Sequence, residues 1–303
     1  MARLFDAYIM VDWSAATKPV TGVNSIWVGV MARDARLKFQ FTAANPSTRV
    51  KAIELIKGLI AKLNRRGDRV LLGFDFSFGY PAGTAKALGL ETESQPAWRA
   101  MMAFLASKLK DKEDNNNARY AIAAGMNYKI SGGPFPFWGA PARDQVKTLS
   151  GKKSDFTTGL LPEYRQTEMY LREHLKAKPK SAWQLAYTGS VGSQSLTGLP
   201  HILALRDSLP GAKLWPFETG LNVLDEEALS EVQTVIAEIY PSALEIKAKE
   251  GEILDEAQVR GAAMYYHDLD TRSALGGLFG PPPELDSLNI AQLEDEEGWI
   301  LVK

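Results

Sequence analysis

Residues 7–14 read AYIMVDWS, an apolar run that stops on Asp12 and is followed by Trp13 and Ser14. An unbroken apolar run of this length predicts a buried β-strand, with the Asp12 carboxylate at its C-terminal edge. Two further apolar stretches follow at residues 25–31 and 37–41, separated by a polar turn, which predicts a second strand and a hairpin. We therefore expect the chain to open with a β-meander whose first strand ends on Asp12.

A carboxylate in this position has two interpretations. Ribonuclease H-like folds begin their metal site at the end of the first strand of such a meander. Actin-like ATPases and sugar kinases begin their phosphate site there, and residues 12–18, DWSAATK, would then form the phosphate loop. The second interpretation also calls for a glycine-rich adenosine motif and a second Asp-Gly-x-Thr-like loop, and the sequence has no clear example of either.

The composition is that of an ordinary α/β protein. The chain has 303 residues, of which 45% are hydrophobic and 23% charged, enough for one large domain over residues 1–303. A formal net charge of −1 gives no overall basic field for nucleic acid, and the absence of cysteine excludes disulfides, thiolate zinc sites and a cysteine nucleophile. Residues 1–6 lack a signal-peptide pattern, and no apolar stretch could span a membrane, so we expect a cytoplasmic protein without a membrane partner.

Strand and helix patterns alternate along the rest of the chain. Helices are expected at residues 48–65, 95–110, 196–209, 226–233, 255–266 and 268–278, and strands at residues 70–76, 213–217 and 234–241. Residues 125–192 interrupt this pattern with Gly- and Pro-rich sequence, and residues 143–180 hold nine Lys or Arg against five Asp or Glu. We expect a long irregular insertion there, either a lid or substrate platform or a solvated excursion, whose Phe135, Phe137 and Trp138 stack a base or pack the loop.

Carboxylates recur near the ends of the buried-looking strands, at Asp12, Asp75 and Glu238, and Asp255 lies at an expected helix start. Strand C-terminal ends converge on the ligand crevice of an open α/β sheet, and carboxylates that meet there repel one another without a cation. Oxygen ligands of this kind suit Mg²⁺ or Mn²⁺, which can activate water and stabilise a leaving oxygen. Each residue also has a structural interpretation, as a turn or helix cap or a backbone hydrogen-bond acceptor.

A second candidate site is the Gly-, Ser- and Thr-rich stretch at residues 187–200, which leads into a helix. Amide groups at a helix N-terminus favour phosphate, so Ser190, Gly192 and Ser193, together with Ser14, are candidate substrate-binding residues. A flexible entry to the helix is the alternative. The stretch has no P-loop ending, the chain has no Gly-x-Ser-x-Gly elbow, and its three histidines are far apart.

Four short motifs occur in order along the chain: VDWS at 11–14, GFDFSFGYP at 73–81, EIYPS at 238–242 and DEAQ at 255–258. Together they resemble the domain-of-unknown-function 429 family, over roughly Tyr8 to Ala274. The resemblance implies a ribonuclease H-like mixed sheet flanked by helices. It also implies a nuclease in which Asp12, Asp75, Glu238 and Asp255 are catalytic and bind Mg²⁺ or Mn²⁺. The chain departs from the family pattern at Ser77, Phe78 and Gln258, which affects the number of metal ligands.

The sequence thus favours a metal-dependent hydrolase, acting on nucleic acid or on a phosphorylated small molecule. An actin-like kinase or ATPase with the same opening meander is one alternative. A non-catalytic module that binds a small ligand or a protein, with structural carboxylates, is the other.

Overall fold

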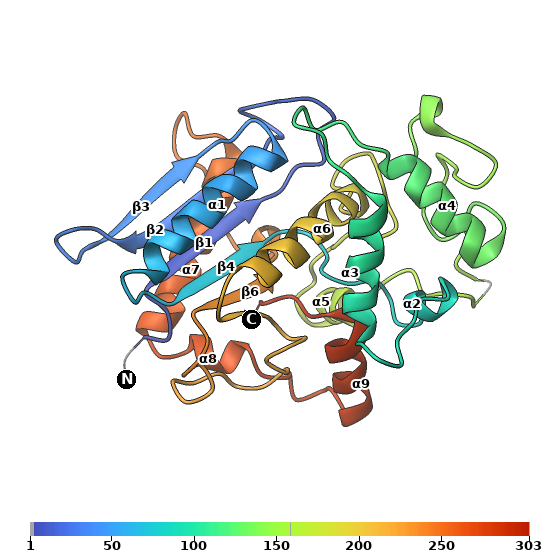
Figure 1. Cartoon of the computed structure of the whole chain (residues 1–303). Coiled ribbons are helices and arrows are strands. Elements are labelled where there is room, and N and C mark those ends of the chain that lie inside the picture. The colour runs from blue at the N-terminus through green and yellow to red at the C-terminus, as the bar shows by residue number, and fades with distance from the viewer. Residues whose placement is uncertain (1–2, 158, 303) are drawn as a thin grey trace.

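The computed structural model describes residues 3–157 and 159–302 and is built around one six-stranded mixed sheet (Figure 1). The strands are β1 (Ala7–Asp12), β2 (Trp27–Arg33), β3 (Phe39–Ala44), β4 (Val70–Phe74), β5 (Ala212–Leu214) and β6 (Thr234–Glu238). Their order across the sheet is β3-β2-β1-β4-β6-β5. The first three form an antiparallel meander, whereas β4, β6 and β5 run parallel to β1. The predicted α/β class and opening meander are confirmed.

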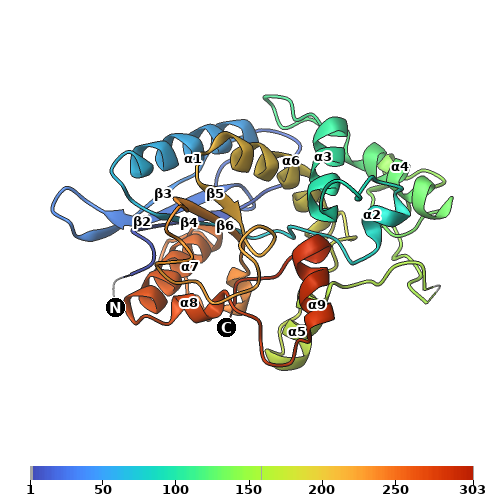
Figure 2. The same cartoon turned by 60° about the horizontal axis from the view of Figure 1, so that its bottom comes forward.

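Helices cover both faces of the sheet (Figure 2). One face carries α1 (Arg49–Asn64) and α6 (Gly192–Ser208), with α3 (Ala97–Lys108) packed beside α6, and the other carries α7 (Leu254–Thr271) and α8 (Leu275–Leu278). Alternate residues of β1 therefore enter two cores, Ile9 and Val11 on the α1 face and Tyr8 and Met10 on the α7 face. This burial on both faces explains why the strand is an unbroken apolar run.

The remaining helical segments are short or lie away from the sheet. They are α2 (Thr84–Ala87), α4 (Arg119–Ser131), α5 (Gln166–His174), α9 (Ser287–Gln292), the 3₁₀ turns Ala142–Asp144 and Pro241–Ala243, and a π-helical turn at Leu293–Glu297. Among the described residues, no helix has both the length and the apolarity needed to cross a membrane.

Several predicted elements need correction. Residues 226–233 form turns rather than a helix. Helix α7 begins at Leu254 with Ile253 as its N-cap, so Asp255 is not the cap, and the helix continues to Thr271 through the expected break near residue 267. Helix α6 begins at Gly192, inside the stretch expected to be irregular.

The segment at 125–192 contributes to the main core as well as to the surface. It contains most of α4 and all of α5, and Phe135, Phe137 and Trp183 are buried in the same cluster as β1 and β4. The interpretation of Phe135 and Phe137 as exposed stacking groups is therefore wrong, because their rings are used in packing.

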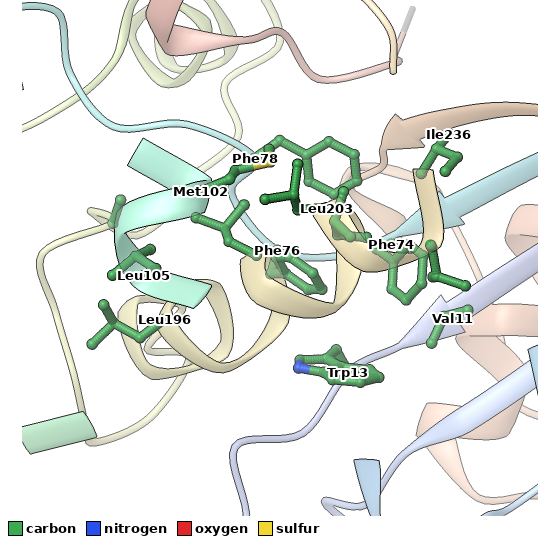
Figure 3. Packing of buried hydrophobic residues seen from close by; sticks show 14 of the residues in the cluster. Val11, Trp13, Phe74, Phe76, Phe78, Met102, Leu105, Leu196, Leu203 and Ile236 are labelled. Carbon is green, nitrogen blue, oxygen red and sulfur yellow. The ribbon is translucent and has the colours of Figure 1, made fainter. Parts of the chain in front are cut away.

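An aromatic row packs the sheet edge against α6 and α3 (Figure 3). Trp13, Phe74, Phe76 and Phe78 follow one another in this row, with each ring centroid no more than 5.9 Å from the next. Phe76 lies against α6 at Gly198, where an added Cβ would come within 2.2 Å of the ring. The row fixes the backbone on either side of Asp12 and Asp75.

Candidate functional site

The parallel strands β1, β4 and β6 bring three predicted carboxylates to one edge of the sheet, but not to one face. Val11 is aligned with Phe74, and Phe74 with Glu238. Because side chains alternate along a strand, Glu238 lies on the face of Phe74, whereas Asp12 and Asp75, one residue further along, lie on the α7 face. The register therefore separates Glu238 from the two aspartates.

Asp12, Asp75 and Asp255 form a group that we call the aspartate cluster. The Asp12 and Asp75 carboxyls share a hydrogen bond, and the amide of Trp13 donates to Asp75 Oδ1 at 2.7 Å. Asp255, on the first turn of α7, accepts from the amide of Asn24 through Oδ2 at 2.6 Å. A strand end, the residue after a strand and a helix start thus converge, as the sequence predicted for these three positions.

The cluster carries more negative charge than its surroundings neutralise. Burial raises the pKa of Asp12 well above its usual value, and the charges of Asp75 and Asp255 raise it further. Burial likewise raises the pKa of Asp75 to about 7, although the hydrogen bond from the Trp13 amide opposes this shift. Without a cation, the pair therefore holds a proton that ordinary aspartates would have lost near neutral pH.

Glu238 belongs to a different group, which we call the arginine cluster: Arg165, Glu168 and Glu238. Arg165 donates through Nη1 to Glu238 Oε2 at 2.8 Å and through Nη2 to Oε1 at 2.6 Å, and its Nε donates to Glu168 Oε1 at 2.8 Å. The amide of Phe78 also donates to Glu238 Oε2. All three side chains are buried, so Glu238 is held by Arg165 rather than by the aspartates.

A pocket of about 770 Å³ opens over the aspartate cluster. Its wall includes five acidic residues, Asp12, Asp75, Asp255, Glu168 and Glu238, and three basic residues, Arg119, Lys178 and Lys180. Within the described residues, no group of three or more Asp, Glu, His or Cys side chains is arranged to hold a metal ion. Any cation at this site would therefore depend on the Asp12–Asp75 pair, completed by water or by a ligand.

Three of the predicted substrate-binding residues, Ser14, Ser190 and Ser193, line this pocket. Gly192 does not, because its amide donates to the Gln184 carbonyl at 2.9 Å and its Cα packs against the Ala182 carbonyl, where a Cβ would lie at 2.5 Å. Ser14 Oγ donates to the Asn24 carbonyl at 3.1 Å, which ties the two loops beside the aspartates together.

The loop after β1 is fixed by a buried arginine that sequence reasoning missed. Arg49 Nη1 donates to the carbonyls of Ser14 and Ala16, and its Nε and Nη2 bind the two carboxylate oxygens of Asp111 at 2.6 and 2.7 Å. Burial alone would raise the pKa of Asp111, but hydrogen bonds from Arg49 and His201 lower it. Asp111 lies in a polar run that reads as an exposed turn, and no periodicity marks it as buried.

In comparisons with known proteins, no family model, curated protein or solved structure matches this chain. The resemblance to the domain-of-unknown-function 429 family stays a prediction.

Proposed function

We propose that this protein is a divalent-metal-dependent hydrolase of phosphate esters. The observation that carries the proposal is the Asp12–Asp75 carboxyl pair, which no buried cation neutralises among residues 3–157 and 159–302, on the wall of a pocket that also presents Arg119, Lys178 and Lys180. A pocket wall that presents both acidic and basic side chains suits a metal–phosphate complex better than either ion alone.

The donor set fits a hard cation. Mg²⁺ is commonly held by one or two carboxylates, with waters and substrate phosphates completing its shell, so Asp12 and Asp75 suffice as protein ligands. Mn²⁺ accepts the same oxygen donors. Glu238 is not part of this set, because both of its oxygens accept hydrogen bonds from Arg165. When bound, the cation would polarise a phosphoryl oxygen and make a neighbouring water more acidic.

Residues of the chain would bind the phosphate groups and accept a proton from the attacking water. The side chains of Lys178, Lys180 and Arg119 attract and orient the phosphate groups, and Ser190 offers a further hydroxyl donor. Asp255 is half-buried beside the pair and can accept a proton from an attacking water.

The strand order β3-β2-β1-β4-β6, with aspartates on β1, after β4 and on α7, supports a ribonuclease H-like fold within this proposal. A pocket of this volume is in the range of small-molecule sites, which favours a phosphorylated small molecule or a nucleic-acid end as substrate over a duplex. An actin-like kinase is less favoured, because the amide of Ala16 already donates to Ser14 Oγ and Lys18 does not line the pocket.

The test is a thermal-shift titration with Mg²⁺ and Mn²⁺, followed by hydrolysis of bis(p-nitrophenyl) phosphate and p-nitrophenyl phosphate. We expect a metal-dependent rise in melting temperature and metal-dependent hydrolysis, both lost in Asp12→Asn/Asp75→Asn. Asp268→Asn, an exposed aspartate on α7, is the matched control and should keep both. Wild-type protein that responds to neither metal contradicts the proposal; a response only to ATP with Mg²⁺ favours the kinase, and no response at all favours a binding module.

A further inference from the structure

Arg119 is a buried cation without a carboxylate partner. It is the first residue of α4, its side chain lines the pocket, and the residue is only 5% exposed. Its Nε donates to Ser193 Oγ at 3.1 Å and its Nη1 donates to Asn117 Oδ1 at 3.3 Å, and both acceptors are neutral. No carboxylate in the described part of the chain forms an ion pair with it.

The other two deeply buried arginines behave differently. Arg49 binds both oxygens of Asp111, and Arg165 binds Glu168 and Glu238. Burying a charge without a counter-ion is unfavourable, and accordingly burial lowers the pKa of Arg119. The charge of Asp111 raises the pKa of Arg119 and that of Arg49 lowers it, but Asp111 is already paired with Arg49.

Two helix N-termini add to the positive potential at this point. Arg119 begins α4, and Ser193, to which it donates, is the second residue of α6. Neither first turn holds an acidic residue, and the one side-chain acceptor at the start of α4, Asn117 Oδ1 on the Arg119 amide at 3.2 Å, is neutral. A guanidinium at the positive ends of two helix dipoles is unfavourable unless an anion joins it. The aromatic ring of Tyr120, whose centroid lies 4.6 Å from Arg119 Cζ, packs on the same group.

We infer that Arg119, Ser193 and the first turn of α6 form an anion subsite for a phosphomonoester, separate from the aspartate cluster. The subsite deepens the proposed hydrolase by naming its substrate class, and in that respect it rests on the proposed function. The substrate carries a second phosphate besides the ester that is cleaved, and Arg119 holds it while the aspartate end of the pocket holds the reacting group. Phosphate binding at Arg119 itself requires no metal.

The experiment measures the affinity for inorganic phosphate by isothermal titration calorimetry at constant ionic strength, in EDTA so that no metal takes part. Wild-type protein should bind phosphate with saturation. Arg119→Gln should weaken this binding at least tenfold, and Arg119→Lys should weaken it less, because a lysine keeps the charge but loses the planar donor pair. Arg143→Gln, whose side chain is 76% exposed, is the control and should bind as wild type does.

Equal phosphate affinity in wild type and Arg119→Gln, or no binding by wild type, overturns the subsite. Equal binding of acetate overturns its selectivity for phosphate. Because Arg119→Gln can alter folding, each variant is first shown to unfold cooperatively, and Arg119→Lys repeats the test with the charge retained. Wild-type protein that responds to Mg²⁺ but does not bind phosphate would count against the subsite alone. Wild-type protein that binds phosphate but does not respond to Mg²⁺ would count against the hydrolase alone.

Discussion

The aspartate cluster and the arginine cluster lie at the same edge of the same sheet, yet their chemistry is opposite. In the arginine cluster, a buried guanidinium donates to both carboxylates, so their charges are already paired although Glu168 and Glu238 line the same pocket. In the aspartate cluster, two neighbouring carboxyls line the pocket without an arginine bound to them among the described residues, and burial raises the pKa of both. A carboxylate at a strand end is therefore a candidate ligand only where the fold does not already supply its cation.

The largest effect on stability is expected when the guanidinium of the arginine cluster is removed. Arg165→Met should lower the free energy of unfolding by about 3–5 kcal/mol, because Glu168 and Glu238 would remain buried without a partner. Urea unfolding monitored by circular dichroism measures the change.

Two further variants sharpen this prediction. Arg165→Met/Glu168→Gln/Glu238→Gln should recover most of the lost stability, because no charge stays buried. Glu238→Gln alone should leave the response to Mg²⁺ unchanged. A loss below about 1 kcal/mol in Arg165→Met would contradict the assignment of Arg165 as the essential counter-ion.

The aspartate cluster should respond to charge removal with the opposite sign. In metal-free protein the raised pKa of Asp75, about 7 against about 3.9 for an unfolded aspartate, means that the native state binds more protons between these values. This contribution to stability is present below about pH 4 and is lost as the pH rises through 7. Asp12→Asn removes the repulsion, so it should be more stable than wild type at pH 8, by about 1–3 kcal/mol.

The measurement is urea unfolding of both proteins in EDTA at pH 5 and pH 8. The difference in the free energy of unfolding between Asp12→Asn and wild type should shrink at pH 5. Adding Mg²⁺ at pH 8 should raise the free energy of unfolding of the wild type but not that of the variant. Glu238, Glu296 and Glu297, whose pKa values burial also raises, are present in both proteins, so their effects cancel in the difference. An advantage of the same size at both pH values would mean that the carboxyl pair does not share a proton.

The sequence predicted the strands that carry these carboxylates because a buried strand is a visible apolar run, and Asp12, Asp75 and Glu238 each stand near the end of one. It did not predict which carboxylates face one another, because that depends on strand register. A shift of one residue moves a side chain to the other face, and Glu238 is aligned with Phe74 rather than with Asp75.

The contacts of the buried arginines, which distinguish the two clusters chemically, could not be predicted from the sequence either. Arg165 lies in a segment without periodicity, and its partner Glu238 is 73 residues further along the chain. Arg49 and Arg119 each stand at the first residue of a helix, where an arginine reads as an ordinary surface residue. Contacts so distant in sequence leave no local pattern, so the sequence could identify acidic residues but could not tell which of them were already neutralised.

The smallest expected effect concerns Asp255, which belongs to the aspartate cluster through its charge and comes from a helix rather than a strand. Asp255→Asn keeps a side-chain oxygen for the amide of Asn24, so the loop should hold its place while one negative charge is lost. A charge near a protein surface contributes on the order of 1 kcal/mol, which corresponds to a roughly fivefold weaker affinity for Mg²⁺.

Calorimetric titration with Mg²⁺ measures this loss, with Glu256→Gln, the next residue of α7, as the matched control. Unchanged affinity would remove Asp255 from the cluster. Complete loss of binding would make it a direct ligand, and the cluster would then use three carboxylates where the Asp12–Asp75 pair alone is proposed. Either result tests whether the distinction between the two clusters lies in the number of their carboxylates or, as argued above, in the presence of a buried arginine.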